Sequence, residues 1–143
     1  MRPPAILAAV IAVAFGAAPA MAAEVTVTVD QIHSAEGKVY VTLWGSADTW
    51  LDDQKSLQNI GLPAANGAVT FTLHDVAPGQ YAIATFHDEN ADGEMDFNFF
   101  GYPTEGYAFS RDVRPFLSAP SFESCAFTVG IDDVALTIHM VYP

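Results

Sequence analysis

Ten residues near the middle of the chain, His87 to Asp96, carry oxygen-bearing side chains at alternate positions around a glycine. With Asp88 counted as position one, the ligand positions of a calcium loop fall in order on Asp88, Asn90, Asp92, the Glu94 backbone carbonyl and Asp96, with Gly93 at position six. Calcium takes six to eight oxygens at about 2.3–2.6 Å, so the chain must curl tightly, and glycine supplies the backbone freedom for the bend. This spacing predicts a calcium site.

Position twelve of the same loop, where an EF-hand supplies a bidentate glutamate, is Phe99. We expect Glu105, another distant carboxylate or water to complete the shell, with weak affinity on the order of 10⁻⁴–10⁻³ M. A solvated hairpin turn is the alternative, because Asp-Gly is a strong turn signal between strands. Five carboxylates within nine residues favour the metal, since they repel one another unless a cation lies among them.

The first 23 residues have the three parts of a secretory signal peptide: Arg2, an apolar stretch from Ala5 to Ala18, and the small-residue pattern Ala20-Met21-Ala22. The apolar stretch is shorter than the roughly 20 residues of a membrane-spanning helix, so we expect cleavage near Ala23 and no membrane span afterwards. The predicted location is the periplasm or the outside of the cell. Residues 24–143 should form a single domain, because this length is too short for two ordinary ones.

The chain that remains after cleavage is strongly acidic. It has four basic and seventeen acidic residues, a formal charge of −13. Such a surface attracts cations and repels nucleic acid and anionic lipid headgroups, so no nucleic-acid partner is expected. Cys125 is the only cysteine, which excludes an intrachain disulfide, and we interpret it as a buried apolar group. The oligomeric state is not determined by the sequence.

Apolar and polar residues alternate with the period of two that is typical of half-buried strands. The expected inward residues are Val25, Val27, Val29, Val39, Val41, Leu43, Val69, Phe71, Leu73, Leu136 and Ile138. We interpret the first two alternating segments as a hairpin across a turn at 34–37, and residues 48–60 as a short helix or an ordered loop. Short strands without a convincing long helix predict an all-β protein, a single Ig-like or prealbumin-like antiparallel β-sandwich of about seven strands.

Several short motifs follow one another in the second half of the chain: Pro78-Gly79-Gln80-Tyr81-Ala82, His87-Asp88-Glu89-Asn90-Ala91-Asp92-Gly93, Phe100-Gly101-Tyr102-Pro103, Glu105-Gly106-Tyr107 and Phe109-Ser110. With them the chain resembles the secreted bacterial family catalogued as domain of unknown function 2141, which implies no activity. The turn, strand and acidic loop are also similar to the calcium loops of B-type repeat domains in bacterial surface proteins, which implies a prealbumin-like sandwich. Those loops usually have a carboxylate at position twelve, where this chain has Phe99.

Six aromatic residues follow the acidic loop within thirteen positions: Phe97, Phe99, Phe100, Tyr102, Tyr107 and Phe109. They lie in a segment, residues 97–115, that has no regular pattern, and long irregular segments of compact domains are usually functional. Exposed rings would offer a platform to a sugar ring, a pigment or a partner protein. The interpretation that we favour is that the rings pack this segment onto one sheet as a small second core.

Known catalytic motifs are missing from the sequence: it has no nucleophile elbow, no zinc-protease motif and no phosphate-binding loop. The four histidines do not have zinc spacing, and we interpret His87 as a hydrogen-bonded structural residue at a strand end. We therefore predict a secreted or periplasmic non-catalytic module that binds calcium in the 88–96 loop and meets a ligand or partner through the 97–111 loop. The alternative is a small hydrolase that uses acids such as Asp88, Asp92 and Glu105.

Overall fold

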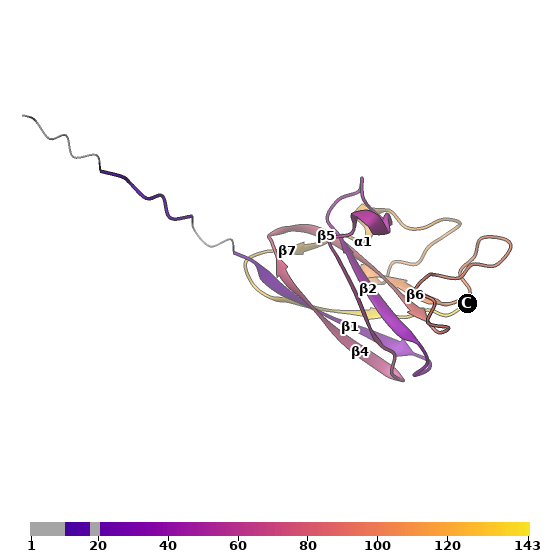
Figure 1. The fold of residues 1–143 in the computed structure, drawn as a ribbon. Helices are drawn as coiled ribbons and strands as arrows, with labels where there is room; N and C mark the ends of the chain where they lie inside the picture. Colours follow the sequence, from indigo (N-terminus) through magenta and orange to yellow (C-terminus); the bar gives the residue numbers. More distant parts are fainter. Residues whose placement is uncertain (1–10, 18–20) are drawn as a thin grey trace, which may run out of the picture.

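The protein is a sandwich of two sheets in a computed structural model that describes residues 11–17 and 21–143 (Figure 1). The first sheet has the order β4-β1-β8 and contains β1 (Ala23–Ile32), β4 (Gly67–Val76) and β8 (Val134–His139). The second has the order β3-β2-β5-β6 and contains β2 (Lys38–Trp44), β3 (Gln58–Pro63), β5 (Gly79–Asp88) and β6 (Gly106–Phe109), with β7 (Phe127–Val129) paired to the start of β5. The predicted all-β sandwich is confirmed, with eight strands instead of about seven.

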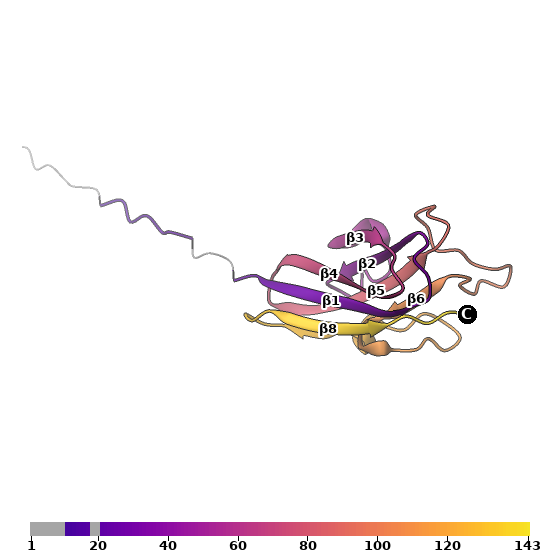
Figure 2. The ribbon, with the colours of Figure 1, turned by 90° about the horizontal axis from the view of Figure 1, so that it is seen from below.

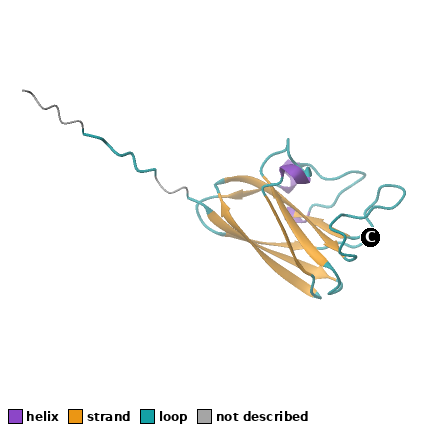
Figure 3. Ribbon diagram, viewed as in Figure 1, coloured by secondary structure: helices purple, strands orange, loops and turns teal. Residues whose placement is uncertain are grey.

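In the part of the chain that the structure describes, helical structure is limited to three short segments, η1 (Asp53–Lys55), η2 (Ser110–Asp112) and α1 (Phe122–Cys125). Every strand pair is antiparallel except one, since β8 runs parallel to β1. Figure 2 shows β1 and β8 side by side in one layer. Figure 3 shows that the long loops gather at the end of the sandwich where the C-terminus lies.

The core lies between the sheets and is built from the alternating positions of the strands. The eleven residues predicted to point inward all belong to it, although Val69 and Leu136 are only half-buried. Burial of apolar surface stabilises a folded protein by about 25 cal/mol per Å², so this layer is the main source of stability.

The predicted hairpin of the first two strands is wrong. β1 pairs with β4 and β8, whereas β2 pairs with β3 and β5 in the opposite sheet. Alternation indicates which face of a strand is buried and says nothing about which strand lies beside it. The turn that precedes Lys38 therefore carries the chain from one layer to the other.

The segment 48–60 contains η1 and the start of β3, a strand that the sequence did not reveal. Gly61 and Pro63 weaken its strand pattern, because both residue types are unfavourable inside sheets. Gly61 has a packing reason here: it faces Tyr40 on β2, and a side chain at position 61 would collide with the Tyr40 ring. Gly61 therefore makes room for the Tyr40 ring and at the same time weakens the sequence pattern by which β3 could have been predicted.

The outer face of the five-stranded sheet is covered over one half only. A second cluster of buried residues, Ala82, Phe109, Phe122 and Cys125, packs there with Trp50. The Trp50 indole N–H donates to the Pro120 carbonyl at 2.9 Å, which ties two distant loops together. Cys125 is buried as expected, and burial raises the pKa of its thiol, so it is a packing residue.

The predicted signal peptide, residues 1–23, lies partly outside the described residues. Within 11–17 and 21–143, no helix is long and apolar enough to cross a membrane.

Ser110 joins three elements at the edge of this second cluster. Its buried Oγ accepts a hydrogen bond from the Ile83 N–H of β5 at 2.9 Å and donates one to the Cys125 carbonyl of α1 at 2.6 Å. One hydroxyl therefore satisfies two buried backbone groups, each of which would cost free energy if left unpaired.

Ser110→Ala should lower the free energy of unfolding by about 2 kcal/mol, because it leaves both backbone groups without a partner. Urea denaturation of the mature protein measures the loss. Ser118→Ala, at an exposed position, is the matched control and should change stability by less than about 0.5 kcal/mol. Equal losses in the two variants would contradict this role of Ser110.

Candidate functional site: an acidic loop beside an aromatic cleft

The acidic loop, residues 88–96, begins where β5 ends and folds back onto its own first residue. Asp88 is fully buried, and its carboxylate accepts the N–H of Asp92 at 3.1 Å and the N–H of Gly93 at 2.8 Å. Ala91 and Gly93 have φ values of 57° and 83°, the left-handed conformation that a tight curl requires. The loop is thus shaped by a buried carboxylate at position one.

Three exposed or half-buried side chains of the loop meet at one point. The Asn90 side-chain nitrogen donates to Asp96 at 2.7 Å and to Asp92 at 3.3 Å, so an amide lies between two carboxylates. Asp92 in turn accepts the N–H of Glu94 at 2.9 Å. The electropositive N–H₂ group partly offsets the repulsion between the two acids.

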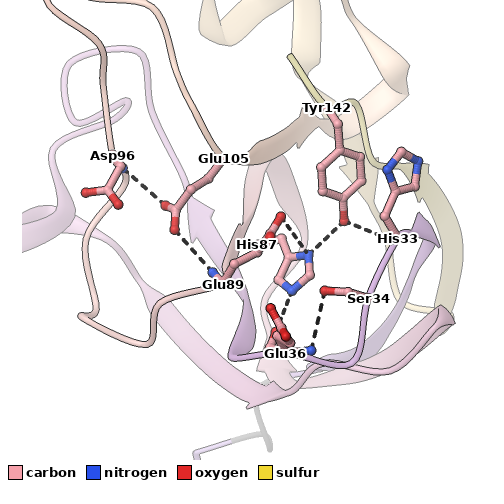
Figure 4. A network of polar contacts seen from close by, with 8 residues as sticks. All are labelled: His33, Ser34, Glu36, His87, Glu89, Asp96, Glu105 and Tyr142. Atoms are coloured by element: carbon pink, nitrogen blue, oxygen red, sulfur yellow. Dashed lines mark hydrogen bonds and ion pairs between the residues drawn. The ribbon is translucent and has the colours of Figure 1, made fainter.

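Glu105 closes the loop from the other side, at the residue before β6. Its buried carboxylate accepts the N–H of Glu89 and the N–H of Asp96, both at 3.1 Å (Figure 4). Burial raises the pKa of Glu105, and the neighbouring carboxylates of Asp96 and Asp88 raise it further, while the two N–H donors act in the opposite direction. Glu105 therefore holds both ends of the acidic loop by hydrogen bonds, and its charged form is disfavoured by burial and by the neighbouring carboxylates.

Five of the six predicted metal ligands lie in this loop and are connected by hydrogen bonds. The sixth, Glu105, contacts the loop from outside, and both its oxygens accept backbone N–H groups. No group of three or more His, Cys, Asp or Glu side chains in the described residues stands ready to hold a metal ion. The calcium site stays a prediction.

His87, the residue before the loop, is buried and hydrogen-bonded at both ring nitrogens, which confirms its structural interpretation. Nε2 lies 2.6 Å from the Glu36 carbonyl, which can only accept, so Nε2 carries a proton. In the neutral ring, Nδ1 then accepts from the Tyr142 hydroxyl at 2.7 Å, and the Tyr142 oxygen accepts the His33 N–H at 3.1 Å. Figure 4 shows how this network fastens the C-terminal segment and the first interlayer turn to the root of the acidic loop.

An open cleft of about 890 Å³ lies over the uncovered half of the five-stranded sheet. Its floor contains Tyr40, Phe86 and Tyr107, which are in register on β2, β5 and β6. The rings of Tyr40 and Phe86 stack at 5.1 Å with an angle of 14°. Residues 93–103 form one wall, with five of them facing the cleft as an apolar or aromatic surface, and residues 115–119 form another.

The favoured interpretation of the aromatic segment is wrong for four of its six rings. Phe97, Phe99, Phe100 and Tyr102 are exposed by 60 to 97%, and only Tyr107 and Phe109 pack onto the sheet. The loop is held by its backbone instead: the Asn98 side-chain oxygen accepts the N–H groups of Phe100 and Tyr102, and Phe97 pairs with Pro103. Because these contacts order the loop, its rings need not be buried.

Sequence reasoning missed the floor of the cleft and its second wall. Tyr40 and Phe86 occupy the strand positions that alternate with the core residues, and aromatic rings on a face expected to meet solvent were the signal that could have found them. The second wall, which includes Pro115 and Leu117, has no such signal, because only the tertiary fold brings it opposite the 93–103 segment.

The family model described as uncharacterized proteins conserved in bacteria (DUF2141) matches residues 27–137. The chain belongs to this family. The match begins within β1 and ends within β8, so it includes the acidic loop and both walls of the cleft. No curated protein and no solved structure gives a significant match to this DUF2141 protein. The resemblance noted from the motifs is confirmed, and the family assigns no activity.

The raised pKa of Glu105 predicts the sign of a pH effect. A carboxyl whose pKa in the folded state lies above its ordinary value of 4.5 stabilises the fold at lower pH, and this contribution is lost as pH rises through the raised pKa. In chelator, the wild-type free energy of unfolding should therefore fall relative to Glu105→Gln as pH rises from about 4 to 8. Urea denaturation across this range measures it.

Glu36→Gln is the control for this pH series, because the Glu36 side chain is exposed and should leave the wild-type pH profile unchanged. A stability difference between wild type and Glu105→Gln that stays constant would mean that the pKa of Glu105 is the same in the folded and unfolded states. A change of the opposite sign would mean that folding lowers this pKa, and either result would contradict the prediction.

Proposed function

We propose that this protein is a secreted or periplasmic non-catalytic binding module in which calcium, held by the acidic loop, stabilises one wall of the aromatic cleft, and the cleft receives a ligand. One observation carries this proposal: the two features share residues. Gly93, Glu94 and Met95 belong to the predicted calcium loop and also line the cleft. A cation that orders the loop would therefore order part of the binding surface.

The contacts of the loop support a cation as its missing partner. Asp88, Asn90, Asp92, Asp96 and the Glu94 backbone carbonyl would hold it, since a carboxylate has about four acceptor positions and the Asp88 side chain uses two of them on N–H groups. A calcium ion would take over from the Asn90 amide as the positive partner of Asp92 and Asp96. Calcium supplies charge neutralisation here and has no catalytic part.

The exposed rings support a ligand for the cleft. Eight aromatic side chains line it, and its size falls in the range of about 300–1,000 Å³ that is usual for small-molecule sites. Contiguous apolar surfaces of this kind mark binding sites, because a monomer gains nothing by exposing them. The signal-peptide pattern of residues 1–23 supports export to a compartment where calcium reaches millimolar levels.

The hydrolase alternative stays a prediction, and no contact in the described residues favours it. Both oxygens of Asp88 and of Glu105 accept backbone N–H groups, so these two acids hold the loop backbone in place.

Calcium should raise the thermal midpoint of the wild-type mature protein, because binding to the folded state adds RT ln(1 + [L]/Kd), or about 2.7 kcal/mol at a hundredfold excess over Kd. Magnesium should do less, since it keeps its waters and demands a tighter octahedral shell. Asp92→Ala should abolish the calcium effect while the sandwich stays folded, because Asp92 is exposed. Melts in chelator and in millimolar calcium measure both effects.

Asp132→Ala is the matched control for this melt: it removes one exposed carboxylate from the β7–β8 turn and should keep the full calcium effect. Asp88→Ala is a poorer test, because Asp88 is fully buried and its loss removes the acceptor of the Gly93 N–H and one of the two acceptors of the Asp92 N–H even without metal. Equal midpoints with and without calcium, with no heat of binding, would leave only an acidic turn.

Ordering of the cleft wall is a separate expectation. Calcium should slow amide hydrogen exchange in residues 97–103 as well as in the acidic loop, because Asp96 and Thr104 are joined by a backbone hydrogen bond at the base of the 97–103 segment. Exchange of the wild type and of Asp92→Ala, each with calcium and with chelator, measures it. Protection confined to residues 88–96 would separate the metal site from the cleft.

A further inference from the structure

We infer that the ligand of the aromatic cleft is an organic cation, a quaternary or protonated amine that carries apolar groups. This inference rests on the binding role of the cleft proposed above and adds the chemical class of the ligand. It depends on the charges that line the cleft, on the kind of apolar surface between them, and on the charge of the whole chain.

The charges along the cleft are of one sign. Asp53 of η1 and Glu94 of the acidic loop line it from two separate segments, and within the described residues no lysine, arginine or histidine lines it with them. Lys55, two residues after Asp53, forms an ion pair with Asp52 at 3.1 Å. Arg114 directly precedes Pro115 of the second wall but does not line the cleft, and its guanidinium lies 3.5 Å from the His139 carbonyl. If calcium binds the loop, its ligand at Glu94 is the backbone carbonyl, so the Glu94 carboxylate remains available to a ligand in the cleft.

The apolar surface between these carboxylates is mostly aromatic. Ring faces carry negative electrostatic potential, and a cation within about 6 Å of a ring centre gains roughly 0.5–2 kcal/mol, more as it loses water. Rings and carboxylates together therefore favour one kind of guest, a positive charge on an apolar body. The net charge of −12 for the whole chain adds long-range attraction for the same class.

Other ligand classes fit these groups less well. An anion, such as a fatty acid or a phosphate ester, would meet both carboxylates and no compensating cation. A neutral apolar guest would take water from Asp53 and Glu94 without giving them a partner, which costs free energy. A neutral sugar could stack on the rings, yet its affinity would not depend on the two charges.

The test uses the full mature protein in calcium with two probes, benzyltrimethylammonium and the neutral benzyl alcohol, whose binding is followed by calorimetry. The cation should bind more tightly than the alcohol and weaken with added salt. In the double variant D53N and E94Q, the Kd of the cation should rise about tenfold while that of benzyl alcohol stays the same. Glu123→Gln, an exposed acid on α1, is the control and should change neither Kd.

A second variant, Phe100→Ser, locates the binding. Phe100 is 80% exposed, so the substitution should leave the fold intact and weaken both probes. Benzyl alcohol that binds as tightly as the cation, with neither probe affected by D53N and E94Q, would overturn the cation assignment and leave the cleft as a binding site. If neither probe binds the wild type, both the assignment and the proposed role of the cleft fail.

Discussion

Two buried carboxylates that accept backbone N–H groups hold together the end of the sandwich that carries the candidate site. Asp88 bends the acidic loop onto itself, and Glu105 joins both ends of that loop to the start of β6. Both acids are satisfied by hydrogen bonds, yet they lie near Asp92 and Asp96, so their charges add to an unfavourable local field. The 97–103 segment depends on this arrangement, because the acidic loop joins it to β5 and the Thr104 N–H donates to the Asp96 carbonyl at its base.

The faces of the strands could be predicted from the sequence, and their partners could not. Alternation at Val25, Val27 and Val29 identifies a buried face correctly, because burial acts on each residue separately. Pairing is a property of the whole sandwich, so β1 and β2 were wrongly joined. β3 was missed for a different reason: Gly61 weakens the strand pattern and serves the Tyr40 ring on the next strand.

The candidate site divides in the same way. The acidic loop is local in sequence, and its spacing alone brought together Asp88, Asn90, Asp92 and Asp96. Glu105 contacts this loop from nine residues beyond Asp96 and sixteen residues beyond Glu89. The cleft is assembled from β2, β5, β6 and two loops, and no short stretch of sequence contains its pattern. The rings of Phe99 and Phe100 are exposed, and the loop that carries them is held by the Asn98 side-chain oxygen, which accepts backbone N–H groups in a way that only the folded loop reveals.

The central claim is that one cation site and one binding surface share a wall. A calcium titration of the mature protein, followed through its amide NMR resonances, tests this most directly. We expect saturable shifts at Asp92 and Gly93, and shifts with the same midpoint at Phe100 and Tyr102, while the amides of β4 on the opposite sheet stay unchanged. Shifts that never saturate, or that spread over all acidic surfaces alike, would show that calcium only screens the charge of the protein and would contradict the account.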